Sequence, residues 1–201
     1  MGRPGLNRAA VIAAAADLAD DLGFDAVTIS VLARHLGVRS PTLYSHVSGA
    51  TDLRTAVTAH VLHELADATS AATAAGEGRD LLVAFADAIR DFARRSPGRY
   101  DATTRQRIPV APEVAPGSVA EAITAGRRNA DIALRVVRSY GVPEAGETYA
   151  VRLMSSLVHG YITLEIAGSF AHSDPSSETT WPDVLDDLDR ILQGAVAARR
   201  H

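Results

Sequence analysis

The sequence predicts an all-helical (all-α) protein, and three observations carry this prediction. Apolar residues recur at spacings of three and four along most of the chain, as they do on one face of an α-helix. Glycine, proline and capping residues separate these stretches in the way that is typical of helix ends. No alternation of apolar and polar residues, the pattern of a half-buried strand, stands out in the 201 residues.

The first helix is expected at about residues 8–22. Asn7 precedes it as a plausible N-cap, and Gly23 follows it as a residue that can end a helix. The apolar stripe of this helix consists of Val11, Ala15, Leu18 and Leu22.

Two shorter helices follow, joined by a sharp turn. Thr28 can cap a helix that Gly37 ends, since glycine adopts the left-handed backbone of such a turn without a steric cost. The inner face of this helix consists of Ile29, Leu32, Ala33 and Leu36. Ser40 is expected to cap the next helix, with Pro41 in its first position and its end at about His46. The pair predicts a helix-turn-helix.

Longer helices fill the rest of the chain. A proline-rich loop is expected at 109–117, and the helices are expected at about 52–75, 80–95, 100–107, 119–139, 144–167 and 182–198. We therefore expect two domains, a helix-turn-helix domain at 1–50 and a larger helical domain at 51–201.

Composition excludes several classes of protein. The apolar fraction of 47% is too high for a disordered chain, and the apolar runs are too short to cross a bilayer. The N-terminus has no apolar signal segment, so we expect a cytoplasmic protein. The absence of cysteine excludes disulfides and thiolate metal sites. The net charge of −4 is low for a DNA-binding protein, but residues 1–50 are neutral, which leaves room for a weak basic face.

The outer surface of the helix-turn-helix suits DNA. Inward packing of the apolar side chains leaves a polar rim, which consists of Ser40, Thr42, Tyr44, Ser45 and His46. Hydroxyl groups there can donate to phosphate oxygens, and Arg39 can reach the backbone or a guanine edge. Pro41 and Thr42 can contact a thymine methyl group.

The segment 28–47 closely resembles the DNA-binding domain of TetR-family transcriptional regulators. The resemblance rests above all on Pro41-Thr42-Leu43-Tyr44 followed by His46-Val47. His159-Gly160-Tyr161, the stretch 164–170 and the stretch 96–100 resemble the C-terminal domain of the TetR subgroup named for a Trp-His-Gly motif. Val158 stands where that motif has tryptophan.

The resemblance implies a homodimeric repressor that binds a palindromic operator on double-stranded DNA and responds to a small-molecule effector. Its motif positions imply DNA contacts by Thr28, Ser40, Thr42, Tyr44 and His46, with Ser30 and Arg39 at the edge. Many members carry a lysine where this chain has Ala50. Binding is therefore expected to depend on Arg3, Arg8 and Arg39, the first two as a flexible arm. Alternatively, Arg3 and Arg8 belong to a solvated tail that does not contact DNA.

The helix around 153–166 is apolar almost all round, so it needs cover on every side. We expect a second copy to cover it in a homodimer formed through the last two helices, although burial within one chain is the alternative. Candidate residues of the effector pocket are Phe85, Ile89, Phe92, Tyr100, Met154, Leu157, His159 and Tyr161. For His159, a hydrogen-bonded core histidine is the competing interpretation.

No motif indicates catalysis or a bound cofactor. The chain lacks a nucleophile elbow and a phosphate-binding glycine loop, so we expect no enzyme. His60 and His63 are close enough in sequence to share a metal ion, but no second ligand pair accompanies them, and surface or packing roles are favoured. The competing function is a helical small-molecule-binding or scaffolding protein that does not bind DNA.

Overall fold

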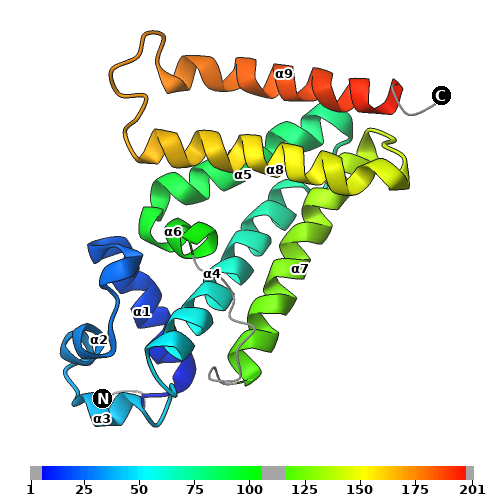
Figure 1. Ribbon diagram of the computed structural model, residues 1–201. Coiled ribbons are helices and arrows are strands. Elements are labelled where there is room, and N and C mark those ends of the chain that lie inside the picture. The colour runs from blue at the N-terminus through cyan, green and yellow to red at the C-terminus, as the bar shows by residue number, and fades with distance from the viewer. Residues whose placement is uncertain (1–5, 106–115, 198–201) are drawn as a thin grey trace. The chain divides into compact units, whose positions relative to one another are not determined.

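The computed structural model describes residues 6–105 and 116–197, and all regular secondary structure in these two stretches is helical (Figure 1). The all-α prediction is therefore confirmed. In chain order the helices are α1 (Arg8–Leu22), the 3-10 turn η1 (Phe24–Ala26), α2 (Ile29–Leu36), α3 (Ser40–Leu43), α4 (Ala50–Ala72), α5 (Gly78–Arg95), α6 (Pro97–Arg105), α7 (Pro116–Ser139), α8 (Glu144–Ile166) and α9 (Ser177–Ala197).

The ends of α1 and α2 lie where the capping residues predict them. The Asn7 side chain accepts a hydrogen bond from the N–H of Ala10 at 2.9 Å, and α1 ends before Gly23. The Thr28 hydroxyl accepts a hydrogen bond from the N–H of Val31, and Gly37 closes α2 in the left-handed region with φ of 67°. These local signals suffice because each one satisfies backbone groups that a helix end leaves unpaired.

The prediction for α3 is wrong in two respects. Arg39, not Ser40, occupies the N-cap position, and no side chain caps this helix. The helix also ends at Leu43, not at about His46. The N–H groups of His46 and Val47 both donate to the carbonyl of Leu43, so the chain turns there toward α4.

Helices α6, α7 and α9 begin three to five residues earlier than predicted. The Ser96-Pro97 pair opens α6, because proline is tolerated in the first turn, where its missing N–H has no helical partner. Helix α9 begins at Ser177, since the Ser176 hydroxyl accepts from the N–H of Thr179, and the helix continues through Pro182.

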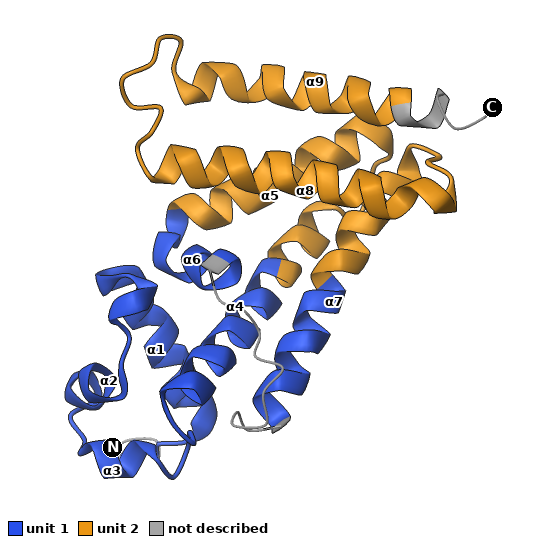
Figure 2. Cartoon of the chain, in the orientation of Figure 1, with its two compact units in different colours: residues 1–65, 95–128 blue, residues 66–94, 129–201 orange. Residues whose placement is uncertain are grey.

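The chain forms two compact units (Figure 2). Unit 1 comprises residues 1–65 and 95–128, and unit 2 comprises residues 66–94 and 129–201. The divisions fall inside α4 and α7 and before the last residue of α5, so each of these helices contributes residues to both units. Within the described stretches, none of the helices combines the length and hydropathy that a membrane span requires.

Each unit has its own apolar core. In unit 1, α6 packs so closely on α1 that a Cβ atom added to Gly98 would lie 1.8 Å from the carbonyl oxygen of Ala19. The fully buried side chains of unit 1 include Val11, Phe24, Leu32, Leu43, Leu53 and Val57. Those of unit 2 include Leu82, Met154, Ile162, Leu188 and Leu192. Helix α3 is therefore held by its single buried residue, Leu43, and presents the rest outward.

Candidate nucleic-acid interface

The polar rim of α3 lies on the surface of unit 1. Leu43 and Val47 are buried and fix the helix, which leaves the other side chains free of the core. The exposed members of the rim are Pro41, Thr42, Tyr44 and Ser45, whereas Ser40 and His46 are half-buried. Tyr44 is 57% exposed, an unusual position for a large aromatic residue. Such a side chain is available to a partner outside the chain.

The other predicted DNA contacts are Thr28 and Ser30, at the start of α2, and Arg39, the N-cap of α3. All three are exposed, and the guanidinium of Arg39 forms no ion pair or hydrogen bond with the residues that the structure describes, although the Arg39 carbonyl accepts from the N–H of Thr42. The Thr28 hydroxyl accepts the capping bond of α2 and keeps its own proton free for donation. The Ser45 hydroxyl, in contrast, donates to the carbonyl of Thr42 at 2.7 Å, so it offers mainly acceptor capacity.

A buried polar cluster supports the turn that follows α3. The carboxylate of Asp52, at the start of α4, accepts hydrogen bonds from the N–H of Ser48 at 2.8 Å and from the hydroxyl of Ser118 at 2.5 Å. Burial alone would raise the pKa of Asp52, but these bonds and the charge of Arg8 together hold the pKa below its ordinary value. Asp52 is therefore a carboxylate at neutral pH.

Neither of the two alternatives for Arg8, a flexible arm or a solvated tail, agrees with the structure. This residue opens α1, and its guanidinium donates to the carbonyl of His46 at 2.6 Å and to the hydroxyl of Ser118 at 2.5 Å. It also lies 3.6 Å from Asp52. Arg8 thus acts behind the rim, as a support, and not as a free chain reaching into a groove. Arg3 lies outside the described residues.

The predicted pocket residues belong to both units. Phe85, Ile89, Phe92 and Met154 are buried in unit 2, whereas Tyr100 is buried in unit 1. Leu157 and Tyr161 lie together on an open groove of about 370 Å³ between α8 and α9. His159 is half-buried, and burial lowers its pKa.

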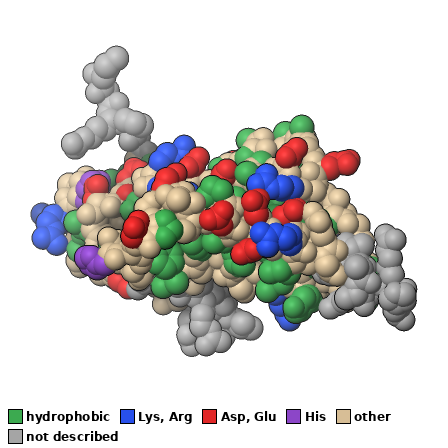
Figure 3. Space-filling model, turned by 90° about the horizontal axis from the view of Figure 1, so that it is seen from above, with side chains coloured by type: hydrophobic (Ala, Val, Ile, Leu, Met, Phe, Trp, Pro, Cys, Tyr) green, Lys and Arg blue, Asp and Glu red, His purple; other side chains and the backbone are tan. Residues whose placement is uncertain are grey.

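The outward side of α8 and α9 remains apolar in places. Buried residues of α8 recur every four positions, so they occupy one face: Gly146, Ala150, Met154, Val158 and Ile162. On other faces Leu164 is 47% exposed, and Ile191 of α9 is 43% exposed. Figure 3, which looks down on the side that carries α9, shows hydrophobic side chains at the surface among charged ones.

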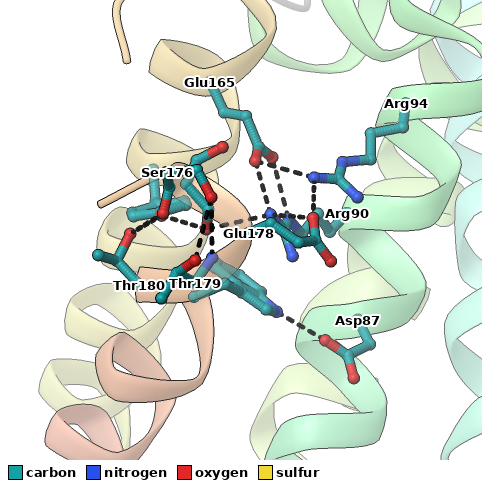
Figure 4. A network of polar contacts seen from close by, with 11 residues as sticks. Asp87, Arg90, Arg94, Glu165, Ser176, Glu178, Thr179 and Thr180 are labelled. Atoms are coloured by element: carbon teal, nitrogen blue, oxygen red, sulfur yellow. Dashed lines mark hydrogen bonds and ion pairs between the residues drawn. The ribbon is translucent and has the colours of Figure 1, made fainter. Parts of the chain in front are cut away.

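An ion-pair network in unit 2 escaped the sequence interpretation (Figure 4). Arg90 and Arg94 of α5 both bind Glu165 of α8 and Glu178 of α9. One signal in the sequence could have indicated it, namely the position of Arg90 on the otherwise apolar stripe of α5. In the structure, Arg90 is only 4% exposed. A buried arginine requires carboxylate partners.

The histidine pair of α4 shows no metal-binding arrangement. Nε2 of His60 lies 3.4 Å from a carboxylate oxygen of Glu64. Across the described stretches, no three histidine, cysteine or acidic side chains are grouped so that they could hold a metal ion.

Comparison with known proteins places these features in a family context. Residues 11–57 match the family described as bacterial regulatory proteins, tetR family, and residues 82–188 match the tetracyclin repressor-like C-terminal domain. An uncharacterised HTH-type transcriptional regulator of Mycobacterium tuberculosis is 33% identical over 163 residues, which cover 81% of this chain and 72% of that protein.

Solved structures share the fold. BioQ of Mycobacterium smegmatis superposes with a TM-score of 0.67 at 22% identity, over 94% of this chain and 99% of that one. A TetR variant of Acinetobacter baumannii, crystallised with minocycline, superposes with a TM-score of 0.59 at 23% identity, over 96% of both chains. At these identities the likeness establishes the fold alone.

Proposed function

Because the chain belongs to the TetR family of transcriptional regulators, a family of DNA-binding, ligand-responsive proteins, we propose that it is a repressor that binds a palindromic operator as a homodimer. We assign DNA binding to a domain at 1–50, and effector binding and dimerisation to a helical domain at 51–201. Regulators of this family are not enzymes, and we propose no catalytic residue or cofactor for this chain.

The observation that carries the proposal is the exposed rim of α3. The rim combines hydroxyl donors, one large exposed aromatic side chain and the free guanidinium of Arg39 on a helix that Leu43 and Val47 fix from behind. Phosphate contacts would supply most of the affinity, and side chains that reach base edges would supply specificity. We propose that the DNA contacts are made by Thr28, Ser30, Arg39, Ser40, Pro41, Thr42, Tyr44, Ser45 and His46.

The outward side of α8 and α9 supports the homodimer. Leu164, which lines the groove between these helices, and Ile191 of α9 both expose apolar surface. Burial of that surface against the same surface of a second copy would remove it from water and would form an isologous four-helix interface. A dimer with two recognition helices binds half-sites about 34–36 Å apart, one turn of B-DNA.

A small-molecule effector would regulate the dimer through differential affinity. A ligand that binds better when the recognition helices are wrongly spaced shifts the population away from the DNA-binding state. The complex of the Acinetobacter protein with minocycline supports a small-molecule effector. We keep the predicted pocket residues of unit 2, namely Phe85, Ile89, Phe92, Met154, Leu157, His159 and Tyr161, as candidates for contact with it.

Selection from the source genome tests this function. The purified protein is incubated with sheared genomic DNA, and the retained fragments are sequenced. We expect enrichment of a few fragments that share an inverted repeat, with half-sites one helical turn apart. Enrichment of a non-repeated motif would contradict the homodimeric mode, and the absence of any enrichment would favour a ligand-binding or scaffolding protein.

A further inference from the structure

Three helices meet at one buried carboxylate in unit 1. Asp52 of α4 is only 2% exposed and is bound by the hydroxyl of Ser118, which belongs to α7 and is itself buried. The charge of Arg8 from α1 lies 3.6 Å away. The N–H of Ser48, in the turn between α3 and α4, also donates to this carboxylate.

Arg8 closes the same cluster on its other side. One terminal nitrogen donates to the hydroxyl of Ser118, and the other donates to the carbonyl of His46, a residue of the recognition rim. Ser118 therefore accepts from Arg8 and donates to Asp52, so a single hydroxyl orders both charged groups. These two groups in turn hold the backbone of the turn at His46 and Ser48.

The contribution of α7 is the unexpected part. This helix runs without a break from Pro116 to Ser139, and its residues from 129 onward belong to unit 2. The first turn of α7 thus contacts, through the hydroxyl of Ser118, the Asp52 and Arg8 side chains that hold the turn after α3. Helix α4, which follows α3 directly, is the obvious link between the two units, and α7 is a second one.

We propose that Ser118 is a positioning residue for DNA recognition: through Asp52 and Arg8 it fixes the turn after α3, and it makes the start of α7 a route by which the C-terminal domain controls that turn. This inference rests on the proposed contact of α3 with DNA. Asp52 and Ser118 are buried, whereas the Arg8 side chain is 36% exposed, so the loss of the hydroxyl leaves a buried carboxylate and a partly buried guanidinium each short of a partner.

A matched pair of substitutions isolates the hydroxyl. Ser118→Thr and Ser118→Val add nearly the same volume, but only threonine keeps the hydroxyl. Thr58→Val serves as the control, because Thr58 is a buried hydroxyl of the same unit that donates to the carbonyl of Ala102 and does not touch the turn. Each variant is measured by hydrogen exchange at residues 44–49 and by affinity for a duplex that the unchanged protein has selected from a random-sequence library.

We expect Ser118→Val to speed amide exchange at 44–49 and to weaken DNA binding about tenfold, with Ser118→Thr close to the unchanged protein. Thr58→Val should lower the melting temperature without either effect. If Ser118→Val does not fold, Ser118→Ala removes the hydroxyl without added volume and takes its place.

Equal exchange at 44–49 in the threonine and valine variants would overturn the inference, whatever their DNA affinity. Faster exchange with unchanged affinity would overturn the role in recognition. If the unchanged protein selects no duplex at all, the proposed function fails, and the exchange measurement still decides whether Ser118 positions the turn.

Discussion

The guanidinium of Arg90 forms two hydrogen bonds with the carboxylate of Glu165, at 2.9 and 2.6 Å, although the residues lie 75 positions apart. Arg90 also lies 4.9 Å from the ring centre of Trp181, whose indole N–H donates to Asp87. This arrangement joins α5, α8 and α9 (Figure 4). It holds the end of α8 and the start of α9, the two helices to which we assign the dimer interface, against α5.

We predict that Glu165→Gln lowers the free energy of unfolding by about 3 kcal/mol at neutral pH. The substitution keeps the shape of the side chain but removes the charge, so the buried guanidinium of Arg90 loses its principal partner. Urea denaturation of the two proteins checks this. A loss below about 0.5 kcal/mol would place the pair among weak surface ion pairs.

The same carboxylate predicts a pH dependence. Hydrogen bonds from Arg90 lower the pKa of Glu165 from 4.5 to about 2, against the opposing effect of burial. Because the pKa is lower in the folded state, the stabilisation is complete above about pH 4.5 and is lost as the pH falls toward 2. The stability difference between the unchanged protein and Glu165→Gln should therefore shrink over this range. A difference that stays constant down to pH 2.5 would contradict the assignment.

Gly98→Ala should disrupt the packing of α6 on α1. The added Cβ would lie 1.8 Å from the carbonyl oxygen of Ala19, a backbone atom that cannot rotate away. We expect a loss of about 3 kcal/mol in the free energy of unfolding. Gly126→Ala is the control, since a Cβ there meets nothing within 4 Å, and alanine should stabilise α7 slightly. Similar stability of the two variants would show that the close approach of α6 to α1 at Gly98 does not contribute to the free energy of unfolding.

Ile191→Glu should convert the dimer into monomers. Ile191 of α9 is 43% exposed within one chain, and a carboxylate there would be buried without a partner in the proposed interface. Ile123→Glu, at a residue of α7 that is 41% exposed, should leave the dimer intact. Sedimentation velocity at micromolar concentration separates these outcomes, and a dimer that survives Ile191→Glu would place the interface elsewhere.

Arg39→Ala should weaken DNA binding and make it less sensitive to salt. If the guanidinium contacts one phosphate, its removal lowers the slope of log affinity against log salt concentration by about one. An unchanged slope with weaker binding would instead assign Arg39 to a base edge. Unchanged affinity and slope would remove this residue from the interface.

The sequence predicts the parts of the fold that depend on nearby residues. The helix ends are an example: the side chains of Asn7 and Thr28 accept hydrogen bonds from N–H groups three positions later, and Gly37 ends α2. These roles follow from the local sequence pattern alone. The α3 rim follows for the same reason, because the inward positions of Leu43 and Val47 determine which side chains remain outside.

Partners distant in the chain could not be predicted. In the sequence, Arg8 looks like part of a flexible or solvated N-terminal segment. Its partner Ser118 lies 110 positions later in the chain, so local pattern cannot reveal their hydrogen bond. Arg90 meets Glu165 only when α5 and α8 are packed together. The end of α3 at Leu43 was likewise not predicted, because no capping residue marks it. The turn that follows is held by the hydrogen bond from the N–H of Ser48 to Asp52 of α4.

The most direct test of the central claim compares two tyrosines of equal exposure. Tyr44 on the α3 rim is 57% exposed, and Tyr149 on α8 is 56% exposed. Affinity for the selected duplex is measured by fluorescence anisotropy for Tyr44→Ala and Tyr149→Ala. We predict a loss of about tenfold or more for Tyr44→Ala and none for Tyr149→Ala. Equal affinities of Tyr44→Ala and the unchanged protein would contradict the assignment of this rim to DNA.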